Sequence, residues 1–490
     1  MATTNNGTTA ASHAANGAGV GTPPVDGRDH VVIFPFMAKG HTLPLLHFAT
    51  ALSVHHRNLH VTLLTTPANR AFARSRLPSS VGLVELPFPS LPPLPAGVES
   101  TDALPCPSLY PTFLRATALL REPFAEFLAS LPSPPLALVS DFFLGFTHRV
   151  AGDAGVRRIV FHGMSCFSMA ICKALIVSPP ASVESGALFH VTGMPEHVKI
   201  TADELPNAVA KFADQEDPVT RFLIDDVGYS DVLSWGVLVN SFPALDKDYV
   251  APLESFYQTG ARAWLVGPLF LAAGDTSELE EEEDPEGCLS WLDERAARPG
   301  SVVYVSFGTQ AHVPDAQLDE IVHGLAQSGH PFLWAVRSDT WSPPADVGPN
   351  GRIVRGWVPQ RSVLAHRAVG GFVSHSGWNS VVESLAAGKP ILAWPMIAEQ
   401  HLNARHVADI IGAGVRIHTK AGGMAAVDVV GRAEVEEKVK VLMDADSEAG
   451  KRMRARATWA QLEAKSVVSE AGASRVAMQE LVDELKSTYV

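Results

Sequence analysis

The sequence predicts an α/β protein made of two doubly wound domains that face each other across a cleft. Twelve short runs rich in β-branched and aromatic residues alternate with helix-length segments. Several of these runs are apolar at nearly every position, which is typical of parallel strands covered by helices on both faces. A stretch rich in Pro, Gly and like charges then separates the runs into two sets.

The predicted strands follow the repeated strand–helix–strand order of a doubly wound fold. In the first half they lie at His30–Phe36, His60–Thr65, Leu83–Phe88, Ala137–Ser140, Arg158–Phe161 and Gly236–Asn240. In the second half they lie at Val302–Phe307, Phe332–Val336, Arg352–Val354, Gly371–Ser374, Ile391–Trp394 and Gly414–Ile417.

The domain boundaries follow from shifts in composition. Residues 1–28 have neither the basic nor the apolar segment of a secretory signal, so we expect a disordered tail. We expect an N-terminal domain over 29–266, a linker over 267–300 and a C-terminal domain over 301–470. The linker contains Gly267-Pro268 and the acidic run Glu278–Asp284. Residues 471–490 predict an amphipathic helix with apolar positions at Val476, Met478, Leu481, Val482 and Leu485.

Composition narrows the function classes. The 490 residues are 46% hydrophobic, and 38 basic against 52 acidic residues give a net charge of −14. This balance argues against nucleic acid or an anionic membrane as the main partner. No apolar run approaches 18 residues, and the four cysteines form neither a disulfide framework nor a zinc pattern. We therefore expect a cytoplasmic protein without stable membrane insertion.

The strongest functional signal lies between Trp357 and Gln400. A predicted strand there turns through His375-Ser376-Gly377 into a helix that begins near Trp378. Backbone N–H groups and the positive end of the helix dipole at such a turn form an anion site suited to phosphate. Glu383, one turn into the helix, suits vicinal hydroxyls such as those of a ribose. An ordinary βαβ unit explains any one of these residues, but not the whole constellation.

A second signal is the pair His41 and Asp141. A strand ends near Pro35, and His41 follows at the start of a predicted helix, where it points into the cleft. A helix N-terminus disfavours the charged imidazole, so His41 suits a general base. Asp141 follows an apolar strand and is placed to fix the His41 tautomer. The alternatives are an exposed loop histidine and a helix-capping aspartate.

The segment Trp357–Gln400 resembles the signature box of plant family-one UDP-glycosyltransferases. The G-H-x-x-P pattern from Gly40 to Pro44 also matches that family, and the similarity extends from Val31 to the C-terminus. The resemblance implies the GT-B fold, in which the N-domain binds the acceptor and the C-domain binds the UDP-sugar. It also implies that the last helix crosses back to the N-domain.

Particular roles are implied by the resemblance. Trp357 would stack on uracil, and Gln360 and Glu383 would hold the ribose. Glu399 and Gln400 would bind the sugar; the family's usual Asp is Glu399 here, and Gln400 fits the glucose pattern. The full set expected to bind the UDP-sugar is Thr309, Trp357, Val358, Gln360, His375, Gly377, Trp378, Asn379, Ser380, Glu383, Glu399 and Gln400. An apolar acceptor pocket is expected from Phe142, Phe143, Met164 and Phe167, each with plain core as its alternative.

The function predicted is inverting transfer of glucose from UDP-glucose to a hydroxyl of a small lipophilic acceptor, giving a β-glucoside. A flavonoid or another phenol is expected as acceptor by analogy alone. The alternatives are a non-catalytic UDP-sugar-binding regulatory protein and a same-fold epimerase or hydrolase. His41 and Asp141 favour the transferase.

We expect no metal or other cofactor. Asp246-Lys247-Asp248 and Asp444-Ala445-Asp446 have the spacing of metal-dependent transferases but lie in polar, helix-like surroundings. The helix N-terminus and His375 are expected to offset the diphosphate charge instead. The expected partners are UDP-glucose and a small acceptor, bound by a monomer.

Overall fold

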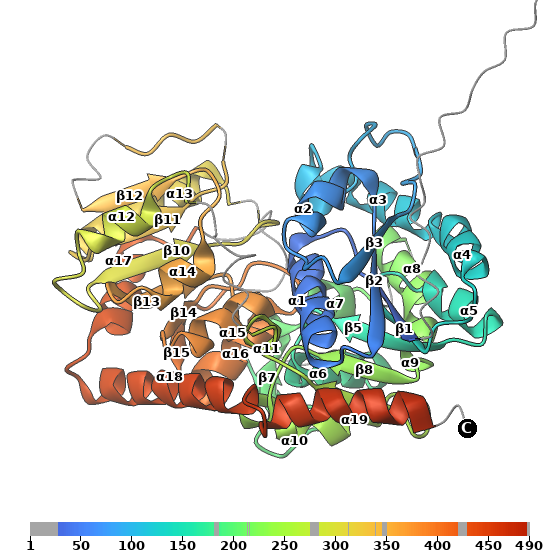
Figure 1. The fold of residues 1–490 in the computed structure, drawn as a ribbon. Helices are drawn as coiled ribbons and strands as arrows, with labels where there is room; N and C mark the ends of the chain where they lie inside the picture. The colour runs from blue at the N-terminus through green and yellow to red at the C-terminus, as the bar shows by residue number, and fades with distance from the viewer. Residues whose placement is uncertain are drawn as a thin grey trace, which may run out of the picture.

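The chain forms two α/β lobes that lie side by side in the computed structural model (Figure 1). It describes residues 28–180, 186–212, 214, 216–274, 284–311, 313–338, 340–344, 350–419 and 429–487. The predicted tail, except for Arg28, and the acidic run, except for Asp284, lie outside the described residues. Within the described part of the chain, no helix is long and apolar enough to cross a membrane.

The first lobe contains a seven-stranded parallel sheet in the order β3-β2-β1-β4-β5-β8-β9. Its strands are β1 (Asp29–Phe34), β2 (Leu59–Thr65), β3 (Val81–Glu85), β4 (Ala137–Asp141), β5 (Arg157–His162), β8 (Gly236–Val239) and β9 (Arg262–Leu265). All six strands predicted for this half are confirmed, but β9 was not predicted. Its four-residue run lacks β-branched residues, and it is held by Trp264, which stacks on Trp235 with ring centroids 5.2 Å apart.

The second lobe contains a six-stranded parallel sheet in the order β12-β11-β10-β13-β14-β15. Its strands are β10 (Val302–Ser306), β11 (Phe332–Ala335), β12 (Gly351–Val354), β13 (Val369–Ser374), β14 (Ile391–Ala393) and β15 (Gly414–Arg416). All six were predicted. The antiparallel hairpin of β6 (Leu188–His190) and β7 (Lys199–Thr201) was not predicted.

Helices cover both faces of each sheet. Those of the first half are α1 (Lys39–His55), α2 (Arg70–Arg74), α3 (Tyr110–Ala118), α4 (Arg121–Ser130), α5 (Phe146–Asp153), α6 (Cys166–Val177), α7 (Asn207–Ala210), α8 (Pro218–Phe222), α9 (Tyr229–Val232), α10 (Pro243–Glu254) and α11 (Leu269–Ala272). Those of the second half are α12 (Cys288–Asp293), α13 (Asp315–Gln327), α14 (Gln360–Ala365), α15 (Trp378–Ala386), α16 (Gln400–Arg405), α17 (Arg432–Met443), α18 (Glu448–Val467) and α19 (Ala473–Ser487).

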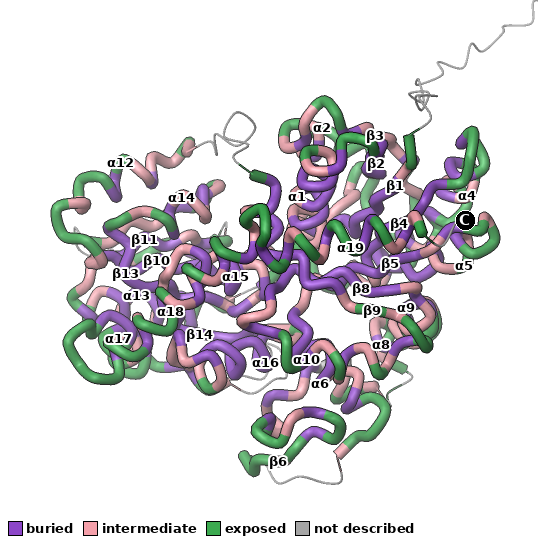
Figure 2. The backbone as a smooth tube through the Cα atoms, turned by 60° about the horizontal axis from the view of Figure 1, so that its bottom comes forward, coloured by how far each residue is buried: buried purple, intermediate pink, exposed green. Residues whose placement is uncertain are grey.

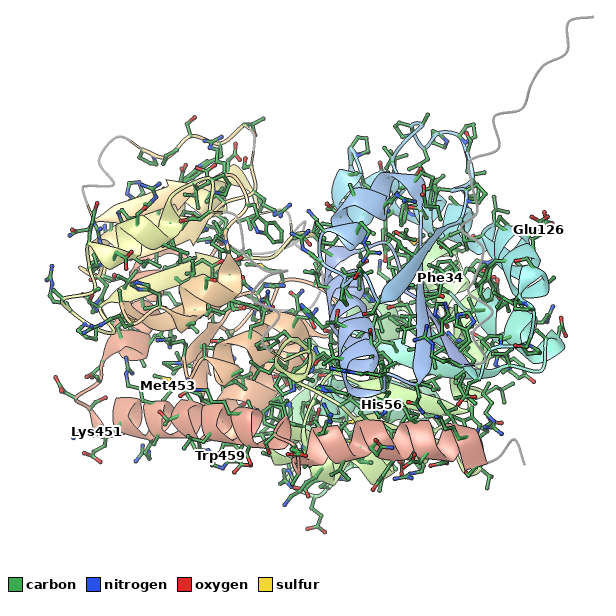
Figure 3. The ribbon with its side chains drawn as sticks, viewed as in Figure 1. Phe34, His56, Glu126, Lys451, Met453 and Trp459 are labelled. Atoms are coloured by element: carbon green, nitrogen blue, oxygen red, sulfur yellow. The ribbon has the colours of Figure 1, made fainter. Side chains whose placement is uncertain are left out.

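The sheets are buried because their strands are apolar on both faces (Figure 2). In β1, Val31 and Ile33 enter one hydrophobic core, whereas Val32 and Phe34 enter the core on the opposite face. Side chains alternate across a strand, so an apolar run supplies two cores at once. Polar side chains such as Glu126 on α4 point outward (Figure 3).

The last two helices run along one side of both lobes (Figure 1). Helix α18 packs beside α15 in the second lobe, and α19 packs on the core of the first lobe. Its buried residues include Met478, Leu481, Val482 and Leu485. The prediction for Val476 was wrong, because its side chain is 43% exposed on the outer face of the helix.

Parallel topology brings the functional ends of the strands together. The carboxyl ends of β1, β4 and β5 in the first lobe lead to His41, Asp141 and Gly163, and those of β10 and β13 in the second lobe lead to Gly308 and His375. His41, Gly163, Gly308 and His375 line one cavity between the lobes. This is where open α/β sheets bind their ligands.

We predict that Leu481→Ala destabilises the protein by about 2–5 kcal/mol, because it opens a cavity in the core that joins α19 to the first sheet. Val476→Ala on the same helix is the matched control and should change stability by less than about 0.5 kcal/mol. Denaturant unfolding of both variants measures the difference. Equal effects of the two substitutions would contradict the packing of α19 described above.

Candidate active site

A cavity of about 560 Å³ lies between the lobes and is lined by residues of both. From the first lobe it is lined by His41 and its neighbours Lys39 and Gly40. Every position that the sequence predicted for the UDP-sugar lines the same cavity: Thr309, Trp357, Val358, Gln360, His375, Gly377, Trp378, Asn379, Ser380, Glu383, Glu399 and Gln400.

His41 and Asp141 are brought together by neighbouring strands. His41 is the third residue of α1, which follows β1, and Asp141 ends β4, the strand that pairs with β1. The His41 Nδ1 atom lies 2.7 Å from Asp141 Oδ2. Asp141 is fully buried, whereas the His41 side chain is 19% exposed. Because Asp141 engages Nδ1, Nε2 is the ring nitrogen left for an incoming hydroxyl.

The charge state of His41 differs from the expectation based on its helix. Burial lowers the pKa of His41, but the Asp141 charge, the hydrogen bond to it and the charge of Glu399 together outweigh burial and raise the pKa above its ordinary value. The shift is therefore opposite in direction to the one expected from the start of α1. The neutral, basic form of His41 is present only as pH rises above this raised pKa.

Beneath this pair lies Arg158, which sequence reasoning missed. Its guanidinium donates to the Asp141 carbonyl oxygen at 3.1 Å and to Ser140 Oγ at 2.8 Å. It also donates to the Ser230 carbonyl oxygen, so that it joins the end of β4 to α9. Arg158 is only 3% exposed, and burial lowers its pKa to about 10. Its position at the start of a strand gave no sign that it would turn inward.

The backbone of the predicted anion site has the expected order of a strand, a glycine-containing turn and a helix. Strand β13 ends at Ser374, and α15 begins after Gly377, which has no side chain to cap the helix. Ser376 has φ 65° and Ala398 has φ 52°, and these are the two non-glycine residues with positive φ in the described part of the chain. Both lie in loops that border the cavity. Such backbone strain is concentrated at functional sites.

His375 is held between two glycines. A Cβ atom at Gly308 would lie 2.6 Å from His375 Nε2, and one at Gly377 would lie 2.5 Å from the same atom. Gly308 also has φ 75°, which disfavours other residues. Burial lowers the pKa of His375 to about 4. His375 is therefore neutral at pH 7, and as a neutral imidazole it can still supply the side-chain donor that the sequence predicted.

Trp378 and Asn379 tie the lobes together. The Trp378 side chain is 1% exposed, and its Nε1 donates to the Asn240 carbonyl oxygen at 2.9 Å. The Trp378 ring therefore belongs to the core, and the backbone N–H is the part of this residue that remains for the predicted diphosphate site. Asn379 Nδ2 donates to the Gly40 carbonyl oxygen at 2.6 Å. The start of α15 is thus fixed to the first turn of α1, which carries His41.

The predicted ribose pair is assembled. Gln360 Nε2 donates to Glu383 Oε2 at 2.7 Å and to Ser380 Oγ at 3.0 Å. The Tyr304 hydroxyl donates to Gln360 Oε1 at 3.2 Å. Gln360 and Glu383 therefore present a preformed pair of polar side chains, oriented from the core strand β10.

Trp357, predicted to stack on a base, faces two cations of the first lobe. Lys39 Nζ lies 5.4 Å from its ring centroid and Arg76 Cζ lies 6.0 Å away. Lys39 is itself paired with Asp102 at 3.0 Å. Both cations line the cavity, and neither was predicted from the sequence.

Glu399 and Gln400, the two residues predicted to bind the sugar, differ in which of their polar atoms are available to a ligand. Burial raises the pKa of Glu399, against the lowering effects of a hydrogen bond from Asn403 and of nearby His41. Gln400 Oε1 accepts from the backbone N–H groups of Met396 and Ile397, at 2.9 Å each. The Gln400 oxygen therefore shapes its own loop, and its NH₂ group is the part available to a sugar.

The predicted acceptor residues separate into three groups. The Phe142 and Phe143 rings lie 6.2 and 5.6 Å from the His41 ring, between centroids. Met164 is half-buried and packs on the core beside α6. Phe167 is fully buried and stacks on His406, so the structure places it in the core and not at an acceptor surface.

The described residues contain no cluster of three or more His, Cys, Asp or Glu side chains placed to hold a metal ion. Asp246 is fully buried, and its carboxylate accepts from the backbone N–H groups of Cys166 and Phe167 at the start of α6. Asp444 accepts from the backbone N–H groups of Asp446 and Ser447. Both D-x-D spacings therefore contain an acid whose carboxylate accepts from backbone N–H groups, those of α6 for Asp246 and those of its own turn for Asp444.

Comparison with known proteins gives consistent matches over both lobes. Residues 29–271 match the family described as "Glycosyltransferase, N-terminal domain", and residues 266–445 match "UDP-glucoronosyl and UDP-glucosyl transferase". Flavonol 3-O-glucosyltransferase UGT89B1 of Arabidopsis thaliana is 36% identical, over 79% of this chain and 84% of its own.

Two solved structures have the same fold. Glycyrrhiza uralensis UGT73P12, complexed with glycyrrhetinic acid 3-O-monoglucuronide, is 29% identical with a TM-score of 0.82, over 94% of this chain and 96% of its own. Phytolacca americana UGT2, complexed with UDP-2fluoro-glucose and pterostilbene, is 28% identical with a TM-score of 0.75, over 94% of this chain and all of its own (100%).

We predict that His41 titrates above its ordinary pKa of 6.5, and that Asp141→Asn brings its pKa below 6.5. Removing the carboxylate charge leaves burial as the dominant influence on the imidazole. NMR of histidine-labelled protein, with His41 assigned by its loss in His41→Gln, measures both values. An unchanged His41 pKa in Asp141→Asn would show that the 2.7 Å contact does not govern the histidine.

Proposed function

The chain belongs to the plant family-one UDP-glycosyltransferases and is a glycosyltransferase with the GT-B fold, and we propose that it transfers glucose from UDP-glucose to a small phenol. The observation that carries this proposal is the position of the His41–Asp141 pair. It lies at the wall of a cavity whose other side holds Trp357, Glu383 and Glu399. A base from one lobe therefore faces donor-binding groups from the other.

The proposed reaction is a single displacement with inversion. His41 Nε2 takes the proton of the acceptor hydroxyl as that oxygen attacks the anomeric carbon, from the face opposite the diphosphate. The bond between the anomeric carbon and the diphosphate oxygen breaks, and UDP leaves. An α-configured donor gives a β-glucoside. Asp141 stabilises the imidazolium that forms, as the orienting acid does in a triad.

The leaving group is stabilised without a metal in this proposal. The first turn of α15 presents backbone N–H groups and the positive end of the helix dipole to the diphosphate. His375 adds a hydrogen bond, and its pKa rises when a dianion binds beside it. We further propose that the enzyme acts as a monomer in the cytoplasm, in keeping with four cysteines that are all free thiols.

Support for glucose comes from Gln400 and from relatives. Gln400 leaves its NH₂ group for a sugar hydroxyl, next to the Glu399 carboxylate. A flavonol 3-O-glucosyltransferase is 36% identical to this chain, and the Phytolacca americana structure holds UDP-2fluoro-glucose. These observations favour glucose among the UDP-sugars.

Support for a phenolic acceptor comes from the rings around His41. Phe36, Phe142 and Phe143 lie between 5.6 and 6.2 Å from its ring, between centroids. Phe36 is only 1% exposed and stacks on Phe143 at 4.7 Å, so it supports from the core the half-buried rings of Phe142 and Phe143, which lie together beside His41. A flat aromatic alcohol would bury its ring there while its hydroxyl meets the imidazole.

The alternatives make different demands on the same residues. A UDP-sugar sensor does not need a base, and a hydrolase needs a water path to the anomeric carbon. The intact His41–Asp141 pair and its aromatic surroundings favour the transferase.

We predict acceptor-dependent UDP release from UDP-glucose, and a loss of about 10²- to 10⁴-fold in kcat for His41→Ala, the range of general-base catalysis. Donor affinity should change little, because His41 acts on the acceptor. The assay uses a panel of phenolic and terpenoid alcohols, with UDP-glucuronate and UDP-galactose as alternative donors.

His323→Ala is the matched control, because this α13 histidine lies outside the cavity. Unchanged turnover in His41→Ala would exclude the mechanism. UDP release that needs no acceptor would indicate a hydrolase, and donor binding without release would indicate a sensor.

A further inference from the structure

Transfer between two lobes places a strict demand on their alignment. The acceptor oxygen is held beside His41 in the first lobe, and the sugar is held by Glu399 and Gln400 in the second. A misplacement of about 1 Å between reacting groups can cost about a hundredfold in rate. Some contact near the sugar must therefore fix the Glu399 carboxylate relative to the acceptor lobe.

One side chain makes that contact. Asn403 on α16 donates from Nδ2 to Glu399 Oε1 at 3.1 Å and to the Ser376 carbonyl oxygen at 2.9 Å. Its Oδ1 accepts from Ser168 Oγ at 2.7 Å, and Ser168 lies on α6 of the first lobe. Asn403, Ser376 and Ser168 are all fully buried. Asn403 thus links the sugar-binding acid, the strained phosphate turn and the acceptor lobe.

The chemistry of the site suits asparagine in particular. Its amide supplies two N–H donors and one acceptor oxygen, and each of these has a partner here. An aspartate has the same shape but no donors, and it would set a second carboxylate beside Glu399.

We propose that Asn403 is a positioning residue that holds the Glu399 carboxylate toward the donor sugar and, through Ser168, aligns it with the acceptor lobe. This inference rests on the proposed function, because it takes Glu399 as the sugar-binding acid. It concerns the sugar more directly than the base and the ribose, since Gln360 pairs with Glu383 and Trp357 faces Lys39.

Docking of α16 does not depend on Asn403 alone. Arg405, on the same helix, forms a 2.9 Å ion pair with Glu204 of the first lobe, which is 5% exposed. Arg416 also pairs with Glu204, and its other nitrogen lies 2.8 Å from Asp409. This ion-pair network holds the helix against the first lobe when Asn403 is changed. The positioning of Glu399 can therefore be tested apart from the docking of the helix.

The decisive variant is Asn403→Asp, compared with the wild-type chain in two measurements. We expect kcat/KM for UDP-glucose to fall about 10- to 100-fold, the range for losing a hydrogen bond to a charged group. The Kd of UDP, measured by calorimetry, should rise by a clearly smaller factor, because UDP lacks the sugar and is affected only through the Ser376 contact. Ser168→Ala should shift kcat/KM in the same direction by a smaller factor while leaving the Kd of UDP unchanged.

Asn58→Asp, at an exposed turn, controls for the added charge and should behave as wild type. Wild-type kcat/KM in Asn403→Asp would overturn the proposal. So would equal losses of UDP and UDP-glucose affinity, because they indicate a general structural role. If the wild-type enzyme uses a UDP-sugar other than UDP-glucose, the proposed glucose specificity is wrong. The role of Asn403 is then decided by comparing kcat/KM of Asn403→Asp and of the wild type with that donor.

Discussion

The contact between the two lobes determines the chemistry, because each lobe holds only half of the site. Trp378 and Asn379, at the start of α15, bind the backbone of the first lobe at Asn240 and Gly40. Gly40 directly precedes His41, so the helix proposed to face the diphosphate is fixed to the first turn of α1, which carries the proposed base. The two halves of the site are therefore held together by direct hydrogen bonds between the lobes.

Burial gives these contacts their strength. Asp141 is fully buried, and its carbonyl oxygen is held by the buried Arg158 guanidinium. Electrostatic interactions are stronger in such an environment than in water, so Asp141 raises the pKa of His41 despite the burial that lowers it. The same burial keeps His375 neutral and raises the pKa of Glu399. Burial thus contributes to the pKa shifts of three groups that line the cavity, namely His41, His375 and Glu399.

Much of the fold could be predicted because buried parallel strands leave dense apolar runs in the sequence. Strand β9 was missed since its run is short and its stability comes from the Trp264–Trp235 stack, a contact with no local signature. The hairpin of β6 and β7 was missed because its short strands are largely exposed and therefore carry no dense apolar run.

The candidate site residues between Trp357 and Gln400 could be predicted because they belong to one contiguous motif. Arg158, Lys39 and Asn403 were missed because their roles depend on partners far away in the chain. Ser168 and Asn403, for example, are 235 residues apart. A single sequence shows local periodicity and turn chemistry, but it does not show which distant polar side chains will meet. The charge states of His41 and His375 could not be predicted for the same reason.

The central claim is a direct displacement in which the base of one lobe activates an acceptor against the sugar held by the other. The most direct test is the anomeric configuration of the first product formed from UDP-α-glucose, read from the coupling of its anomeric proton by NMR. The account predicts the β-glucoside alone. An α-glucoside as the initial product would contradict the single-displacement geometry and require a different catalytic arrangement.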